Sequence, residues 1–172
     1  MDKLEVMISE QQIKDCLKEM GKQITEDYKE NSNLLLVSIL KGSVVFLADL
    51  MRNIDLPLAI DFMVASSYGS GTESRGNVKI IKDLDVNISD YDILIVEDIL
   101  DSGYTLSKII EILKTRNPKS LKVCALLNKP DRRVSPVNLD YTGFVIEDKF
   151  IVGYGLDYDE KYRNLPYIGI LQ

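Results

Sequence analysis

Residues 92–105 carry the side chains of this chain that are best suited to chemistry. The apolar run at 93–96 is followed at once by two carboxylates, Glu97 and Asp98. Four more polar or small residues come next, ahead of an apolar helical pattern: Asp101, Ser102, Gly103 and Thr105. This order predicts a buried strand, an acidic pair, a tight turn of small residues and a helix.

Such an arrangement is suited to a sugar phosphate. Open α/β sheets bind ligands at the carboxyl ends of their strands. A turn that enters a helix directs backbone N–H groups and the positive end of the helix dipole toward one point, which favours a phosphate. Ser102 and Thr105 add hydroxyl donors, and Gly103 lets the backbone approach closely. Glu97 and Asp98 suit sugar hydroxyls or a divalent cation. The same pattern also fits an acidic strand end with a Ser or Thr helix cap.

The elements around this stretch predict an α/β fold with a mostly parallel sheet. Ser9 and Gln12 form the pattern of a capping box, which begins an amphipathic helix that we expect to end near residues 31–33. Buried strands are expected at 34–40, 58–65, 78–82, 93–96, 121–127 and 141–146, with helices at 44–51 and between Thr105 and Asn117. We expect the strand at 78–82 to run antiparallel to the strand at 58–65.

Composition limits the classes of function. The 172 residues are 45% hydrophobic, which fits a single domain with a core of its own. A formal net charge of -6 argues against general binding to nucleic acid or to an anionic membrane. With no leader peptide and no membrane-spanning run expected, and with Cys16 and Cys124 expected as buried free thiols, we expect a cytoplasmic protein. The chain has no histidine, so proton transfer must use a carboxylate, Lys, Tyr or Cys.

Residues 96–105 (Val-Glu-Asp-Ile-Leu-Asp-Ser-Gly-Tyr-Thr) resemble the 5-phosphoribosyl-1-pyrophosphate (PRPP) motif of type I phosphoribosyltransferases. From about the first helix onward, the whole chain is similar to the bacterial hypoxanthine(-guanine) members of that family. The resemblance implies one domain, 1–172. Its twisted sheet core would span roughly 34–146, and its small hood would come from the N-terminal segment and 147–172.

The resemblance also implies roles for the residues of this motif. Glu97 and Asp98 would bind the ribose and a metal ion, and the 5-phosphate would lie on Asp101, Ser102, Gly103, Tyr104 and Thr105. Some family members have a lysine where this chain has Tyr104, so backbone amides and hydroxyls would carry most of the phosphate binding here.

A second turn between a strand and a helix holds Lys41 and Gly42. Its sequence fits a phosphate cradle, and equally a connecting turn with a solvated lysine. In the family, the segment that matches Leu40, Lys41 and Gly42 binds pyrophosphate, and the peptide before the lysine can be cis. Arg163 matches an arginine that contacts pyrophosphate, and the guanidinium fork suits that role.

Residues 67–77 form a polar stretch with three glycines, which fits a long hairpin loop or a functional lid. Ser67 and Tyr68 resemble the start of the family's catalytic lid. We therefore expect this segment to be mobile without ligand and to close during the reaction, which excludes water from the reactive sugar. Hydrogen exchange that is equally fast in the free and ligand-saturated protein would refute the lid.

The last third of the chain supplies candidate contacts to a base. Lys129 follows a buried strand, where it is either one more surface lysine or a donor to a carbonyl oxygen. Aromatic residues near the C-terminus are more often core than stacking platforms. The resemblance implies that Lys129 contacts the oxygen at purine position 6, that Phe150 stacks on the base, that the backbone of Ile151 reads the ring edge, and that Asp157 lies beside the base and a metal-bound water.

The reaction that this resemblance implies is transfer of the phosphoribosyl group of PRPP to N9 of hypoxanthine or guanine. The products would be IMP or GMP and pyrophosphate, as in purine salvage. Mg²⁺ would be the cofactor, with Glu97, Asp98 and Asp157 as candidate ligands. Asp101 would be the general base or proton relay. The implied assembly is a homodimer or homotetramer.

Two alternatives stand beside this reading. One is a PRPP-binding regulator with the same fold and no catalysis, because fold does not fix function. The other, argued from spacing alone, is a flavodoxin-like receiver domain with an acidic pocket. That reading leaves the expected lid and hood unexplained.

Overall fold

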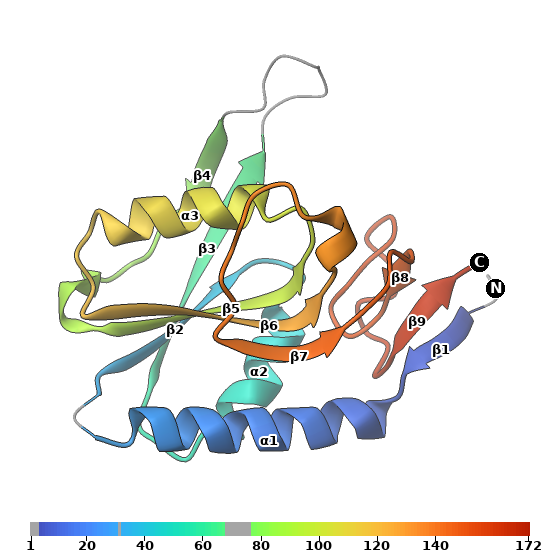
Figure 1. The fold of residues 1–172 in the computed structure, drawn as a ribbon, viewed down its shortest axis with the longest axis horizontal. Helices are drawn as coiled ribbons and strands as arrows, with labels where there is room; N and C mark the ends of the chain where they lie inside the picture. Colours follow the sequence, from blue (N-terminus) through green and yellow to red (C-terminus); the bar gives the residue numbers. More distant parts are fainter. Residues whose placement is uncertain (1–3, 31, 68–76) are drawn as a thin grey trace.

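The computed structural model describes residues 4–30, 32–67 and 77–172, and it has a large sheet between helices with a small second sheet beside it (Figure 1). The helices are α1 (Glu10–Tyr28), α2 (Val44–Met51) and α3 (Tyr104–Lys114). The strands are β1 (Leu4–Ile8), β2 (Leu34–Ile39), β3 (Ala59–Ser67), β4 (Val78–Lys82), β5 (Asp92–Leu100), β6 (Ser120–Asn128), β7 (Tyr141–Val145), β8 (Ile151–Val152) and β9 (Ile168–Leu171). Tyr68 and most of the expected lid lie outside the described residues.

The large sheet has six strands in the order β4-β3-β2-β5-β6-β7. All neighbouring strands are parallel except β4, which is antiparallel to β3, and both features confirm the sequence-based prediction. The central strands each contain a continuous apolar run, 34–37 in β2 and 93–96 in β5, because both faces of the sheet are covered. Helices α1 and α2 pack on one face and α3 on the other, each over its own cluster of buried side chains (Figure 1).

Helix α1 begins as its sequence predicts. The Ser9 hydroxyl accepts from the backbone N–H of Gln12, and the Gln12 side chain accepts from the backbone N–H of Ser9. The helix ends at Tyr28, earlier than expected. Its apolar stripe is buried against the sheet, and Cys124 of β6 is fully buried below it. Cys16 is partly exposed, which corrects the expectation that it is buried, and both thiols are free.

The small sheet joins the two ends of the chain. Its order is β1-β9-β8, and both strand pairs are antiparallel. Figure 1 shows this sheet beside the carboxyl ends of β5 and β6. The family resemblance implies a hood built from terminal segments, and the structure adds that these segments form strands. Within the described residues, no helix is long and apolar enough to cross a membrane.

Candidate active site

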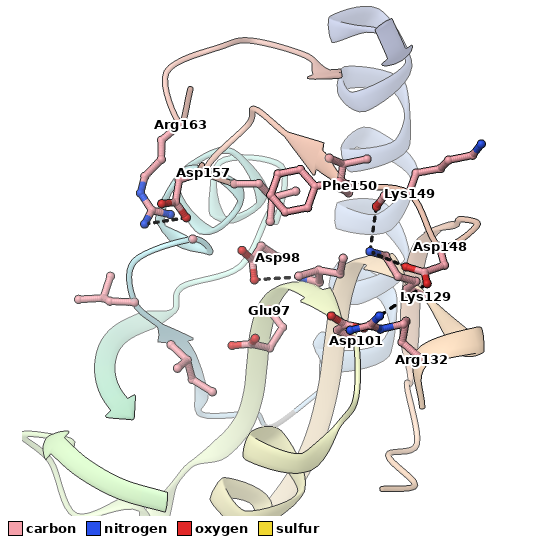
Figure 2. A pocket seen from close by; sticks show the side chains of 16 residues that line it. Glu97, Asp98, Asp101, Lys129, Arg132, Asp148, Lys149, Phe150, Asp157 and Arg163 are labelled. Atoms are coloured by element: carbon pink, nitrogen blue, oxygen red, sulfur yellow. Dashed lines mark hydrogen bonds and ion pairs between the residues drawn. The ribbon is translucent and has the colours of Figure 1, made fainter. Parts of the chain in front are cut away.

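A cavity of roughly 540 Å³ opens between the hood and the carboxyl ends of β2, β5 and β6, a usual size and place for a small-molecule site. Figure 2 shows acidic side chains on its floor and basic side chains at both ends. The lining residues are Ile39, Leu40, Gly42, Glu97, Asp98, Ile99, Asp101, Lys129, Arg132, Asp148, Lys149, Phe150, Ile151, Leu156, Asp157 and Arg163.

Glu97 and Asp98 form the floor of this cavity. The sequence analysis placed them just after the strand, but β5 continues through them to Leu100 because its pairing with β6 continues, with Glu97 opposite Ala125. Burial and the charge of Asp98 hold the pKa of Glu97 well above its usual range. Burial raises the pKa of Asp98 to about 6, against the opposing effect of two backbone hydrogen bonds. Oε1 of Glu97 is buried without a hydrogen-bond partner.

The loop after β2 packs directly on this acidic floor. A Cβ atom at Gly42 would lie 2.0 Å from Oδ2 of Asp98, so only glycine allows this approach. The peptide between Leu40 and Lys41 is cis, as the family resemblance allows. Two buried hydroxyls support the loop from below: Ser43 Oγ lies 2.6 Å from Ser38 Oγ and donates to the carbonyl of Ile39 at 2.6 Å.

The predicted phosphate loop lies between β5 and α3. Gly103 precedes the helix with φ +78°, a conformation that favours glycine. The Tyr104 amide donates to Ser102 Oγ at 3.3 Å, and the phenol oxygen of Tyr104 is buried without a partner. Residues 102–105 do not line the cavity itself, so the structure brings Asp101, but not the rest of this loop, to its wall.

Arg133 is a residue that the sequence analysis missed. Its guanidinium donates to the carbonyl oxygens of Asp101 at 3.1 Å and Leu100 at 3.4 Å, and to Oδ1 of Asn128 at 2.5 Å. The amides of the next two residues donate to the carbonyl of Ser102 at 2.8 and 3.0 Å. Together, these bonds fasten the phosphate loop from behind.

We therefore expect Arg133→Met to loosen the phosphate loop. The variant keeps the length of the apolar stem and loses three hydrogen bonds, so the free energy of unfolding should fall by about 1.5–3 kcal/mol. The KM for PRPP should rise while the KM for the purine stays nearly constant. Urea denaturation and steady-state kinetics measure both, and Arg52→Met, at an exposed arginine of the α2 end, is the matched control. A KM for PRPP equal to that of the unchanged protein would contradict this role.

Four charged groups meet at the end of β6. Lys129 is only 8% exposed, and its ammonium donates to the carbonyl of Lys149 at 3.0 Å and lies 3.6 Å from Oδ1 of Asp148. Arg132 lies between two carboxylates, with Nε 3.6 Å from Asp101 Oδ1 and Nη1 3.7 Å from Asp148 Oδ2. Asp101 Oδ1 is itself buried and accepts no hydrogen bond. Figure 2 shows this cluster on one side of the cavity.

The hood closes the opposite side. The ring of Phe150 is 56% exposed, beside the cavity, and meets Tyr158 edge to face at 5.6 Å. Arg163 donates to the carbonyl of Gly155 at 2.7 Å and pairs with Asp157 at 3.1 Å. These contacts hold a cation and an aromatic face over the acidic floor.

The structure thus brings most of the predicted residues to one cavity. Lys41 is not among its lining residues, nor is Ser67 at the end of β3. Arg132 and Asp148 line it without having been predicted, and their only sequence signal is their nearness to Lys129 and Phe150. Within the described ranges, no three Asp, Glu or Cys side chains are grouped so that they alone could hold a metal ion.

The sequence and the fold of this chain are similar to those of several known proteins. The model of the phosphoribosyl transferase domain matches residues 7–159. The chain is 55% identical to a hypoxanthine phosphoribosyltransferase of Salmonella typhimurium, covering 96% of this chain and 94% of the relative. It is 54% identical to a hypoxanthine-guanine phosphoribosyltransferase of Staphylococcus epidermidis, with 97% and 93% covered. A crystal structure of a hypoxanthine phosphoribosyltransferase from Staphylococcus aureus superposes with a TM-score of 0.94 at 52% identity, over 98% of this chain and 91% of that chain.

Proposed function

Because this chain belongs to the hypoxanthine(-guanine) phosphoribosyltransferases of the phosphoribosyltransferase family, we propose roles for its own residues in the phosphoribosyl transfer that this family catalyses. The activity is transfer of the 5-phosphoribosyl group of PRPP to a 6-oxopurine in purine salvage. One observation carries the proposal: a basic and aromatic edge stands opposite a buried acidic floor, within one cavity large enough for a nucleotide.

We assign the purine to the side of Lys129 and Phe150. The exposed ring of Phe150 offers a face on which a base can stack. The Lys129 ammonium has further N–H groups beyond the one that it gives to Lys149, and one of them suits the oxygen at position 6. The backbone of Ile151 and the carboxylate of Asp157 would lie along the rest of the ring.

Asp101 is the proposed general base. Its buried Oδ1 lies 3.6 Å from Nε of Arg132 but accepts no hydrogen bond, so this oxygen can still accept a proton at the cavity wall. As the purine N9 attacks C1′, the bond between C1′ and the pyrophosphate oxygen breaks, and Asp101 takes the proton from N7. In a chain without histidine, a carboxylate is the natural group for this step.

The PRPP would extend from the acidic floor in two directions. The 5-phosphate would bind at the N-terminus of α3, on residues 101–105, because the helix begins at Tyr104 and its first amides and the hydroxyls of Ser102 and Thr105 are potential donors. The pyrophosphate would bind toward the loop of Leu40, Lys41 and Gly42 and toward Arg163. The closing lid would be the segment 67–77, of which the structure describes only the ends.

Mg²⁺ fits the donor set of the floor. Glu97 has a buried oxygen without a partner, and Mg²⁺ is usually held by one or two carboxylates, with water and substrate phosphates as the other ligands. One or two of the carboxylates of Glu97, Asp98 and Asp157 would hold it together with water and PRPP oxygens. When bound, the cation neutralises the charge of the leaving pyrophosphate.

We also infer the domain organisation, the oligomeric state and the location of this protein. The chain 1–172 acts as one domain, in which the core at 34–146 binds PRPP and the hood at 147–172 closes over the purine and the pyrophosphate. We propose a homodimer or homotetramer, as the family resemblance implies. A cytoplasmic location is supported by the two free thiols.

A product assay tests the proposed function. The protein is incubated with PRPP, Mg²⁺ and hypoxanthine, and IMP and pyrophosphate are measured together. We expect equal amounts of the two products. Binding of PRPP without product, combined with salt-dependent binding of RNA, would instead identify a regulatory protein.

A further inference from the structure

The two cations assigned to pyrophosphate already share an anion, Glu160. Its Oε2 lies 3.0 Å from the ammonium of Lys41, and its Oε1 lies 3.4 Å from Nη2 of Arg163. Among the contacts of the described residues, Glu160 is the one partner of the Lys41 ammonium. A carboxylate therefore bridges the two positive groups that the reaction would use for its leaving group.

Glu160 lies in a tight turn at residues 158–161, beside the two cations. Asp159 and Glu160 both have positive φ values, +51° and +59°, which non-glycine residues seldom adopt. The turn is closed by a pair of backbone hydrogen bonds between Tyr158 and Lys161, and the amide of Glu160 donates to Asp157 Oδ2 at 3.0 Å. Asp159 and Glu160 are the central pair of this turn, which accounts for their positive φ values, and the Glu160 side chain is 64% exposed.

We propose that Glu160 is an internal competitor of pyrophosphate, a carboxylate that occupies Lys41 and Arg163 in the free protein and must leave them when PRPP or pyrophosphate binds. The inference rests on the proposed role of these two cations. It goes beyond that role, because it assigns Glu160 the function of lowering affinity for the pyrophosphate group and so of easing its release.

The charges around Lys41 and Arg163 give the reason for a carboxylate at Glu160. Arg163 keeps its ion pair with Asp157 when Glu160 moves away, so the guanidinium stays in place. The Lys41 side chain is exposed, so its ammonium is free to turn toward an incoming anion. A highly charged product held by two cations would leave slowly, and an anion tethered at the same place competes with it at high local concentration.

Glu160→Gln tests the proposal, because the amide has the same shape and no charge. Titration calorimetry with inorganic pyrophosphate and Mg²⁺ should give a Kd that falls by roughly threefold or more, as expected for one exposed ion pair. The KM for PRPP should fall in the same direction, and product inhibition by pyrophosphate should become stronger. Raising the ionic strength should reduce the difference between the two proteins.

Asp159→Asn is the matched control. It removes the same charge one residue away, and the Asp159 carboxylate pairs with Lys161 at 3.6 Å and not with either cation. We expect its affinity for pyrophosphate to change by less than that of Glu160→Gln. An equal change in both variants, no change in Glu160→Gln, or weaker binding by Glu160→Gln would overturn the proposal.

Two further variants separate this inference from the proposed function. Lys41→Gln and Arg163→Gln should each weaken pyrophosphate binding if these cations bind it. If both leave the affinity unchanged, the assignment of the pyrophosphate site is wrong and the competitor role is wrong with it. If both weaken binding while Glu160→Gln has no effect, only the competitor role is overturned.

Discussion

Asp101→Asn should lower kcat by about two to four orders of magnitude, the usual loss when a general base is removed. The side-chain amide fills the same space, but it does not accept the proton that leaves N7 of the purine. The contact of the loop with Arg133 uses the backbone carbonyl of Asp101, so it is retained in the variant. The affinity for PRPP should therefore change little. Steady-state kinetics with hypoxanthine and calorimetry with PRPP measure these two effects.

Asp131→Asn is the control for this loss. Asp131 is an exposed carboxylate in the short helical turn Pro130–Arg132, close in sequence to the same cluster and outside the cavity lining. It should keep the turnover of the unchanged protein. Turnover by Asp101→Asn within a few-fold of the unchanged protein would remove Asp101 from the chemistry.

Lys129→Gln should lower selectivity for 6-oxopurines over adenine. The Lys129 ammonium is nearly buried, and a purine oxygen at position 6 would accept a hydrogen bond from it, whereas the amino group of adenine would leave that donor unpaired. A hydrogen bond to a charged group contributes about 1.5–3 kcal/mol, so kcat/KM for hypoxanthine relative to adenine should fall by roughly 10- to 150-fold.

The neighbouring Lys149 supplies the control. Its carbonyl accepts from Lys129, while its ammonium points away from the cavity (Figure 2). Lys149→Gln therefore removes an equal charge and leaves the proposed purine contact in place. If the ratio of hypoxanthine to adenine does not move in Lys129→Gln, or moves equally in both variants, Lys129 does not read position 6.

The sequence was a good guide wherever apolar periodicity and local turn chemistry act together. The expected helix at 44–51 and strand at 78–82 coincide with α2 and β4, and the capping box at Ser9 begins α1. Gly103 has the positive φ that a turn before a helix often requires. These features depend on neighbours in sequence, so a pattern of residue types reveals them.

The parts that the sequence missed depend on contacts between distant segments. The length of β5 is decided by its pairing with β6, which carries the strand through Glu97 and Asp98 even though they are charged. The hood strands are too short to show a period, and they exist because the two chain ends pair with each other. Arg133 and Glu160 look like ordinary surface charges in the sequence, and only the fold brings them to the phosphate loop and to Lys41.

A crystal structure with bound IMP tests the central claim most directly, because it places all parts of the nucleotide at once. The account predicts the base against the ring of Phe150, the oxygen at position 6 within hydrogen-bond distance of Lys129 Nζ, and N7 beside Asp101. It predicts the ribose hydroxyls over Glu97 and Asp98 and the phosphate at the N-terminus of α3. A nucleotide bound with its base away from Lys129 and Asp101, or with its phosphate away from residues 101–105, would contradict it.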